Sequence, residues 1–176
     1  MPLARDREEL QRNVDESLAG VEDVAGTKAA TLSILVRAAS QQERADFASA
    51  QASYREFLDA AGDGHELAFL AREGLALALE AAGDTDAALA ELEKLTGSEG
   101  DFYRDQALWQ RARLLEQLGR TDEALALYRQ YIVEFPLAEK SMARAEVKEH
   151  LGKLDPTAIP PEPPPGMGGL QGLVPP

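Results

Sequence analysis

The sequence contains no cysteine and few aromatic residues. Without cysteine, neither disulfides nor thiolate zinc sites can form, and the compartment cannot be inferred from redox chemistry. Aromatic residues make up 6% of a chain that is 44% hydrophobic, and alanine and leucine dominate that apolar share. Such a composition favours helices that pack closely through small side chains over a β-sandwich.

Basic residues are also scarce, since 18 Lys and Arg face 31 Asp and Glu, for a formal net charge of −13. No nucleic-acid partner is expected, because binding a polyphosphate requires clustered positive charge. Residues 56 to 101 contain twelve Asp or Glu but only Arg72 and Lys94. Most of these carboxylates are expected on solvated helix surface, and the alternative is that some face a basic or unfolded partner.

Long apolar runs and catalytic motifs are missing as well. No stretch of about 18 apolar residues could span a bilayer, so the chain as given is expected to be soluble, unless an N-terminal anchor was removed ahead of Met1. The two histidines, His65 and His150, lie far apart and show no metal-ligand spacing, and no Gly-x-Ser-x-Gly turn occurs. We therefore expect no enzyme activity, metal, cofactor or small-molecule substrate.

What the sequence does contain is an internal repeat. The pattern small-x-x-x-x-Ala-x-x-x-bulky-x-x-bulky occurs three times. Its alanines are Ala50, Ala88 and Ala124, at spacings of 38 and 36 residues. The bulky pairs are Tyr54 and Phe57, Leu92 and Leu95, and Tyr128 and Tyr131. Each half-repeat also shows apolar residues at helical spacing, so the repeat unit is expected to be a helix hairpin.

These residues resemble the tetratricopeptide repeat family. In the third copy Leu108, Ala112 and Leu115 occupy the packing positions of the first helix, and Pro136 stands where repeats of that family end. The first two copies carry glycine there instead (Gly62 and Gly100). The resemblance implies an all-α fold, an α-solenoid of about three tetratricopeptide-type hairpins with terminal capping helices and a Pro/Gly-rich tail.

The chain divides accordingly into three parts. We expect an N-terminal helix or stalk in residues 1–26, a repeat domain in 27–152 and a flexible tail in 153–176. Within the domain, the repeats are expected at about 31–64, 69–100 and 105–138, followed by a cap at 137–151. Helices are expected near 4–18, 27–42, 46–60, 65–82, 85–95, 102–118, 121–134 and 137–151.

Several residues have predicted packing roles. Ala50, Ala88 and Ala124 are expected to be buried where the two helices of a hairpin cross closely. Gly83 and Gly119 suit the left-handed residue that ends a helix, while Thr85 and Thr121 are expected to cap the next one. Apolar residues are expected to share the buried face of one helix (Leu67, Leu70, Leu75, Leu79) and of the terminal cap (Met142, Val147, Leu151).

The tail from Asp155 onward holds eight of the ten prolines in 22 residues, so neither helix nor sheet is expected there. The run from Pro160 to Pro165 favours an extended left-handed conformation, which aromatic-lined grooves can bind. The alternative is a disordered terminus or linker.

In the family's usual geometry the first helices of the repeats form a concave groove that binds a peptide or helix of a partner protein. By that resemblance the groove residues are Leu35, Gln42, Glu43, Glu73, Leu77, Glu80, Trp109, Arg113, Glu116 and Gln117. Trp109 is the expected anchor, since an exposed tryptophan supplies a large contact area, and the alternative is that it packs between neighbouring repeats.

Residues 68–83 and 105–131 further resemble bacterial periplasmic tetratricopeptide proteins anchored to the inner membrane, like the ancillary subunit of the Sec translocon. This implies a chaperone-like or scaffolding part in envelope protein traffic, on the periplasmic side if an anchor was removed and in the cytoplasm otherwise. Two alternatives stay open: an architectural or oligomerisation subunit, including a homo-oligomer, and a regulatory domain cut from a longer protein.

Overall fold

Helices account for nearly all of the structured chain. The computed structural model describes residues 12, 16, 20, 28–62, 64–97, 103–135 and 143–158, and no strand occurs among them. The helices are α2 (Lys28–Glu43), α3 (Phe47–Ala61), α4 (Ala68–Ala81), α5 (Thr85–Thr96), α6 (Arg104–Gln117), α7 (Thr121–Glu134), α8 (Arg144–Leu154) and the short 3-10 helix η2 (Pro156–Ala158). The expected all-helical fold is confirmed.

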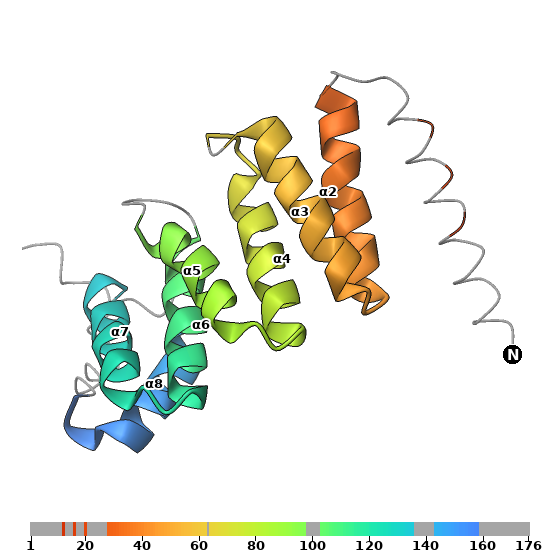
Figure 1. Ribbon diagram of the computed structural model, residues 1–176. Helices are drawn as coiled ribbons and strands as arrows, with labels where there is room; N and C mark the ends of the chain where they lie inside the picture. Colours follow the sequence, from red (N-terminus) through yellow and green to blue (C-terminus); the bar gives the residue numbers. More distant parts are fainter. Residues whose placement is uncertain are drawn as a thin grey trace, which may run out of the picture.

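The helices form a row of antiparallel hairpins, α2–α3, α4–α5 and α6–α7, with α8 packed at the far end (Figure 1). Figure 1 shows α2, α4 and α6 running from top to bottom and the helices between them returning. Each helix packs mainly against its neighbours in sequence. This arrangement is a solenoid, and it places α2, α4 and α6 in equivalent positions.

Small residues line the crossings inside the hairpins. Ala50, Ala88 and Ala124 are all fully buried, as predicted. A second alanine row with the same spacings lies on the first helices and is equally buried (Ala38, Ala76 and Ala112). The bulky residues that follow the first row are also buried in every hairpin, and together these side chains form one continuous core.

The first two hairpins meet at an especially close contact. Tyr54 on α3 is only 5% exposed, and a Cβ atom added to Gly74 on α4 would lie 2.3 Å from its Cζ atom. Gln51 Nε2 also donates a hydrogen bond of 3.2 Å to the carbonyl oxygen of Ala78. Glycine at position 74 therefore lets α4 approach the tyrosine ring.

The hairpin turns use a left-handed residue. Gly83 has φ 87° and Gly119 has φ 72°, which confirms the prediction for both. The capping prediction is wrong, because Thr85 and Thr121 are the first residues inside their helices, and the residues before them make no side-chain cap hydrogen bond. In α3 the cap is Asp46, whose carboxylate accepts a hydrogen bond from the amide of Ser49 at 3.3 Å.

In the first hairpin, the turn residue equivalent to Gly83 and Gly119 is Ala45, which has φ 60°. A left-handed residue with a Cβ atom costs roughly 1–2 kcal/mol, whereas glycine adopts this conformation freely. We expect Ala45→Gly to raise the free energy of unfolding by about 0.5–1 kcal/mol, since greater freedom of the unfolded chain offsets part of the gain. Urea unfolding measures the change. Ala52→Gly, at an exposed site inside α3, should instead destabilise, and a loss at both positions would contradict the argument.

The C-terminal helix differs from the prediction in its extent. Val147 and Leu151 are fully buried, as expected, but α8 continues to Leu154 rather than ending near 151. The expectation that no helix forms beyond Asp155 is wrong for η2. The Asp155 carboxylate accepts hydrogen bonds from the hydroxyl and amide of Thr157, and a further one from Arg129 on α7. These bonds lower the pKa of Asp155 to about 2 and hold the turn against α7.

Some predicted features lie outside the described residues. They include Gly100, Pro136, Met142 and the proline-rich run from residue 160. Of the expected N-terminal helix, only Arg12, Glu16 and Gly20 are described, and each is helical and exposed. The domain boundaries therefore stay predictions.

Candidate interaction surface

Among the described residues, one side of each first helix is built of side chains that are at least partly exposed. On α4 the side chains of Leu75 and Leu79 are buried in the core. At about 100° per residue, Leu70 and Leu77 fall on the opposite side of the helix. Leu70 is 40% exposed, so the prediction that it shares the buried face of Leu75 and Leu79 is wrong. The same geometry holds on α2 and α6, because their buried residues occupy equivalent positions.

We call this surface the open face. It comprises Leu32, Leu35, Ala39, Gln42 and Glu43 of α2, Leu70, Glu73, Leu77, Glu80 and Ala81 of α4, and Gln106, Trp109, Arg113, Glu116 and Gln117 of α6. All ten of the predicted groove residues lie in this set. Their role in binding a partner stays a prediction.

An ion pair joins α4 to α6, the first helices of the second and third hairpins. Arg113 on α6 donates two hydrogen bonds of 2.7 Å to the two carboxylate oxygens of Glu80 on α4. Both side chains are partly exposed, at 22% and 24%. A bidentate pair of this kind is more directional than an ordinary surface ion pair. Glu80 and Arg113 are therefore brought together as partners of each other.

Tyr103, just before α6, also contacts Glu73 on α4. The Tyr103 hydroxyl donates a hydrogen bond to the Glu73 carboxylate, and the ring of Phe69 lies 5.2 Å from that of Tyr103. Burial raises the pKa of Glu73, and the hydrogen bond from Tyr103 only partly offsets this. Burial, together with the same hydrogen bond, also raises the pKa of Tyr103, so its hydroxyl remains a donor at neutral pH.

Trp109 belongs to an aromatic cluster between α6, α7 and α8. Its ring centre lies 5.0 Å from that of His150 and 6.0 Å from that of Tyr128. Glu116 accepts a hydrogen bond of 2.8 Å from the Tyr128 hydroxyl and lies 2.7 Å from Nδ1 of His150. Trp109 is half-buried and packs against the core, so part of its ring is already used for packing.

The α2 residues are arranged differently. Gln42 accepts a hydrogen bond of 2.9 Å from the Tyr54 hydroxyl, and Leu35 packs against the core. Glu43 is exposed and takes part in no hydrogen bond or ion pair among the described residues. It is thus the open-face carboxylate that is best placed to meet a partner.

A comparison of the hairpins explains the Glu80 pairing. In the first and third hairpins, the tyrosine of the second helix donates to the open-face side chain twelve residues before it, as Tyr54 does to Gln42 and Tyr128 to Glu116. In the middle hairpin Leu92 replaces the tyrosine and cannot donate. Glu80 instead pairs with the next hairpin.

Sequence reasoning missed Leu32 and Leu70 as open-face residues. Both are 40% exposed, and they are 38 residues apart, the spacing that separates Ala50 from Ala88. That shared spacing is the signal that could have found them. The third residue of this row is Gln106, so the exposed leucines of this row are confined to the first two hairpins.

Among the described residues no group of three or more His, Cys, Asp or Glu is placed to hold a metal ion. Within the same ranges, no helix is both long and apolar enough to cross a bilayer.

Comparison with known proteins agrees with the repeat geometry. Residues 105–147, which include α6, α7 and the start of α8, match the family model of the tetratricopeptide repeat. A search of curated proteins finds no match to the chain. The matched segment contains the best copy of the sequence repeat, and the hairpins before it repeat its packing. Residues 105–147 therefore carry a tetratricopeptide repeat.

Proposed function

We propose that the open face holds a segment of another protein and that the chain works as a non-catalytic interaction module. Repeats of this family generally mediate protein–protein interactions and are typically not catalytic. The observation that carries the proposal is the pair of leucines, Leu32 and Leu70, exposed at equivalent positions on the open side of neighbouring helices. Exposed apolar side chains that recur in register favour a contact surface over chance exposure.

Site-specific photo-crosslinking tests this function. A reactive amino acid is introduced at position 70 in the cells that produce the protein, and a control is placed at Val133, which is 77% exposed on α7. We expect a defined protein to be captured at 70 and not at 133. The purified partner should then bind the unmodified chain and lose affinity for Leu70→Ser. Equal capture at both positions would reject the open face as the working surface.

The finer role that we propose is chaperone-like or scaffolding work in bacterial envelope protein traffic. Its support is the resemblance of residues 68–83 and 105–131 to anchored periplasmic tetratricopeptide proteins. The identity of the protein captured at position 70 tests it. An envelope protein or a translocon component would support this role, whereas a partner confined to the cytosol would contradict it.

The architectural alternative has less support. It calls for a large apolar patch away from the open face. Among the described residues, the other exposed large apolar side chains are Val36 on α2, Leu118 after α6 and Val133 on α7. Leu118 and Val133 lie on different elements, and scattered exposed residues are ordinary on protein surfaces. Val36 lies one helical turn after Leu32 on α2, beside the open face.

A further inference from the structure

On the open face, exposed leucines lie toward one end and a row of glutamates toward the other, with Glu73 and Leu77 between them on α4. Leu32, Leu35 and Leu70 lie in the first half of their helices, together with the neighbouring ring of Tyr103. Glu43, Glu80 and Glu116 lie in the last turn of α2, α4 and α6. Because these helices run in the same direction (Figure 1), the exposed leucines gather at one edge of the array and the last-turn carboxylates at the other.

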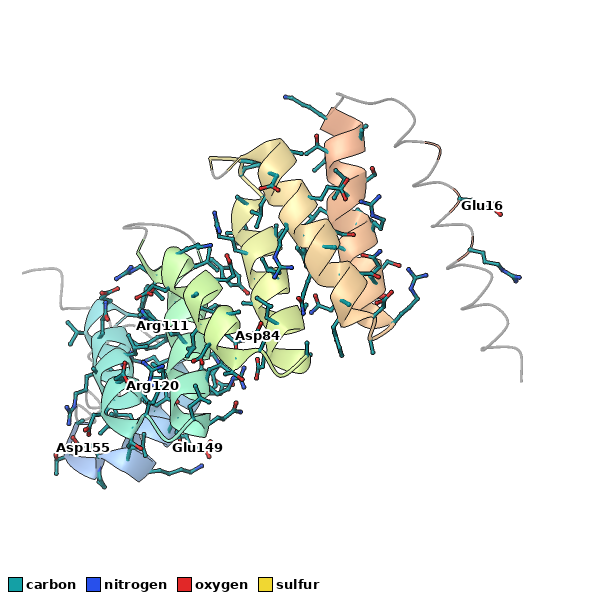
Figure 2. The ribbon with its side chains drawn as sticks, viewed as in Figure 1. Glu16, Asp84, Arg111, Arg120, Glu149 and Asp155 are labelled. Carbon is teal, nitrogen blue, oxygen red and sulfur yellow. The ribbon has the colours of Figure 1, made fainter. Side chains whose placement is uncertain are left out.

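The charge of this surface is one-sided. The open face contains four glutamates and no cation besides Arg113. The helix C-termini at the acidic edge add the negative end of three helix dipoles. Figure 2 labels Asp84 at the α4–α5 turn, where this exposed carboxylate adds to the negative charge near the end of α4. A ligand that covers the leucines therefore also meets an excess of negative charge.

Neither terminal segment of this sequence supplies the complementary charge. Residues 159–176 contain Glu162 and neither lysine nor arginine, and residues 1–27 contain three arginines against seven Asp or Glu. A second copy would bring another chain of net charge −13. An occupant from the same protein would thus add like charge, which opposes association.

We propose that the open face binds a cationic amphipathic segment of a different protein, with apolar side chains over Leu32 and Leu70 and Lys or Arg toward Glu43. This inference rests on the proposed function and specifies the chemistry of the partner. The apolar contacts supply affinity through burial, and the charges set the direction in which the segment lies. Glu80 and Glu116 contribute to the field while they remain bonded within the array.

A designed peptide tests the proposal without knowledge of the natural partner. The probe is a fluorescent peptide of leucine and lysine, with leucines on one helical face, and the controls are a scrambled peptide of the same composition and a leucine–glutamate peptide. Fluorescence anisotropy at physiological salt measures binding. We expect the amphipathic lysine peptide to bind at least about tenfold more tightly than either control.

Protein variants locate the binding. The double variant Leu32→Ser with Leu70→Ser should bind the lysine peptide about tenfold more weakly. Glu43→Lys should lower the affinity for the same peptide by about threefold to tenfold. Val133→Ser and Asp59→Lys, at exposed positions of α7 and α3, are the matched controls and should change little. Circular dichroism verifies that each variant is folded.

The outcomes separate this inference from the proposed function. Equal binding of the leucine–glutamate peptide, or no binding of any peptide, would overturn the cationic partner, while capture at position 70 would still support the open face. Binding of the lysine peptide that ignores the serine substitutions would reflect diffuse attraction to an acidic protein and would also overturn the proposal. Selective capture at position 133 would reject the proposed function itself.

Discussion

Replacing Tyr128 with alanine should lower the free energy of unfolding by about 3–5 kcal/mol. The tyrosine is fully buried, and its ring contacts Trp109 and His150 while its hydroxyl donates to Glu116. Alanine would leave a cavity where α6, α7 and α8 meet and would remove a donor from a half-buried carboxylate. Urea unfolding followed by circular dichroism measures the loss.

Tyr128→Phe is the matched control. Phenylalanine keeps the ring packed and removes only the hydrogen bond to Glu116, which still contacts His150. A loss of about 1 kcal/mol is expected for this variant. If alanine and phenylalanine cost the same, the ring would not be packed as the structure describes.

Gly74→Ala should destabilise the protein by about 1–3 kcal/mol, although the same change inside an ordinary helix stabilises by roughly 1 kcal/mol. The sign reverses because the added Cβ would lie 2.3 Å from Cζ of Tyr54. That ring is buried, and its hydroxyl is bonded to Gln42, so it cannot move aside freely. Thermal or urea unfolding measures the effect.

A double-mutant cycle makes this prediction specific. At the next junction, between α5 and α6, Leu92 stands in place of Tyr54 and Gln110 in place of Gly74. There the smaller leucine leaves room for a residue larger than glycine. Gly74→Ala should therefore cost little in a Tyr54→Leu background, which gives a coupling energy of about 1–3 kcal/mol. Additive effects of the two substitutions would contradict the predicted clash.

The hairpins could be predicted from the sequence because their packing recurs. The alanines at 50, 88 and 124 mark helix crossings that admit only a small side chain, and Gly83 and Gly119 mark turns that need a left-handed residue. Both requirements act within a few residues along the chain. The spacing alone therefore determined most helix bounds to within a few residues.

The open-face contacts could not be predicted in the same way. Glu80 and Arg113 are 33 residues apart, and their pairing depends on how successive hairpins are oriented. The prediction placed Leu70 in the core because leucine at helical spacing is usually buried, and only the repeat register distinguishes the two sides of α4. The cluster around Trp109 likewise needed the position of His150 on α8.

The middle hairpin has leucine where the outer hairpins have tyrosine, and this changes which interactions join it to its neighbours. In a solenoid, stability is a sum of terms intrinsic to each unit and terms between neighbours. The outer hairpins bond their two helices internally through Tyr54 and Tyr128, whereas Glu80 is committed to Arg113 of the next unit. The middle hairpin is thereby joined to the third through Glu80 and Arg113, and to the first through the hydrogen bond from Gln51 to the carbonyl oxygen of Ala78. We therefore expect its unfolding to be coupled to that of the hairpins on both sides.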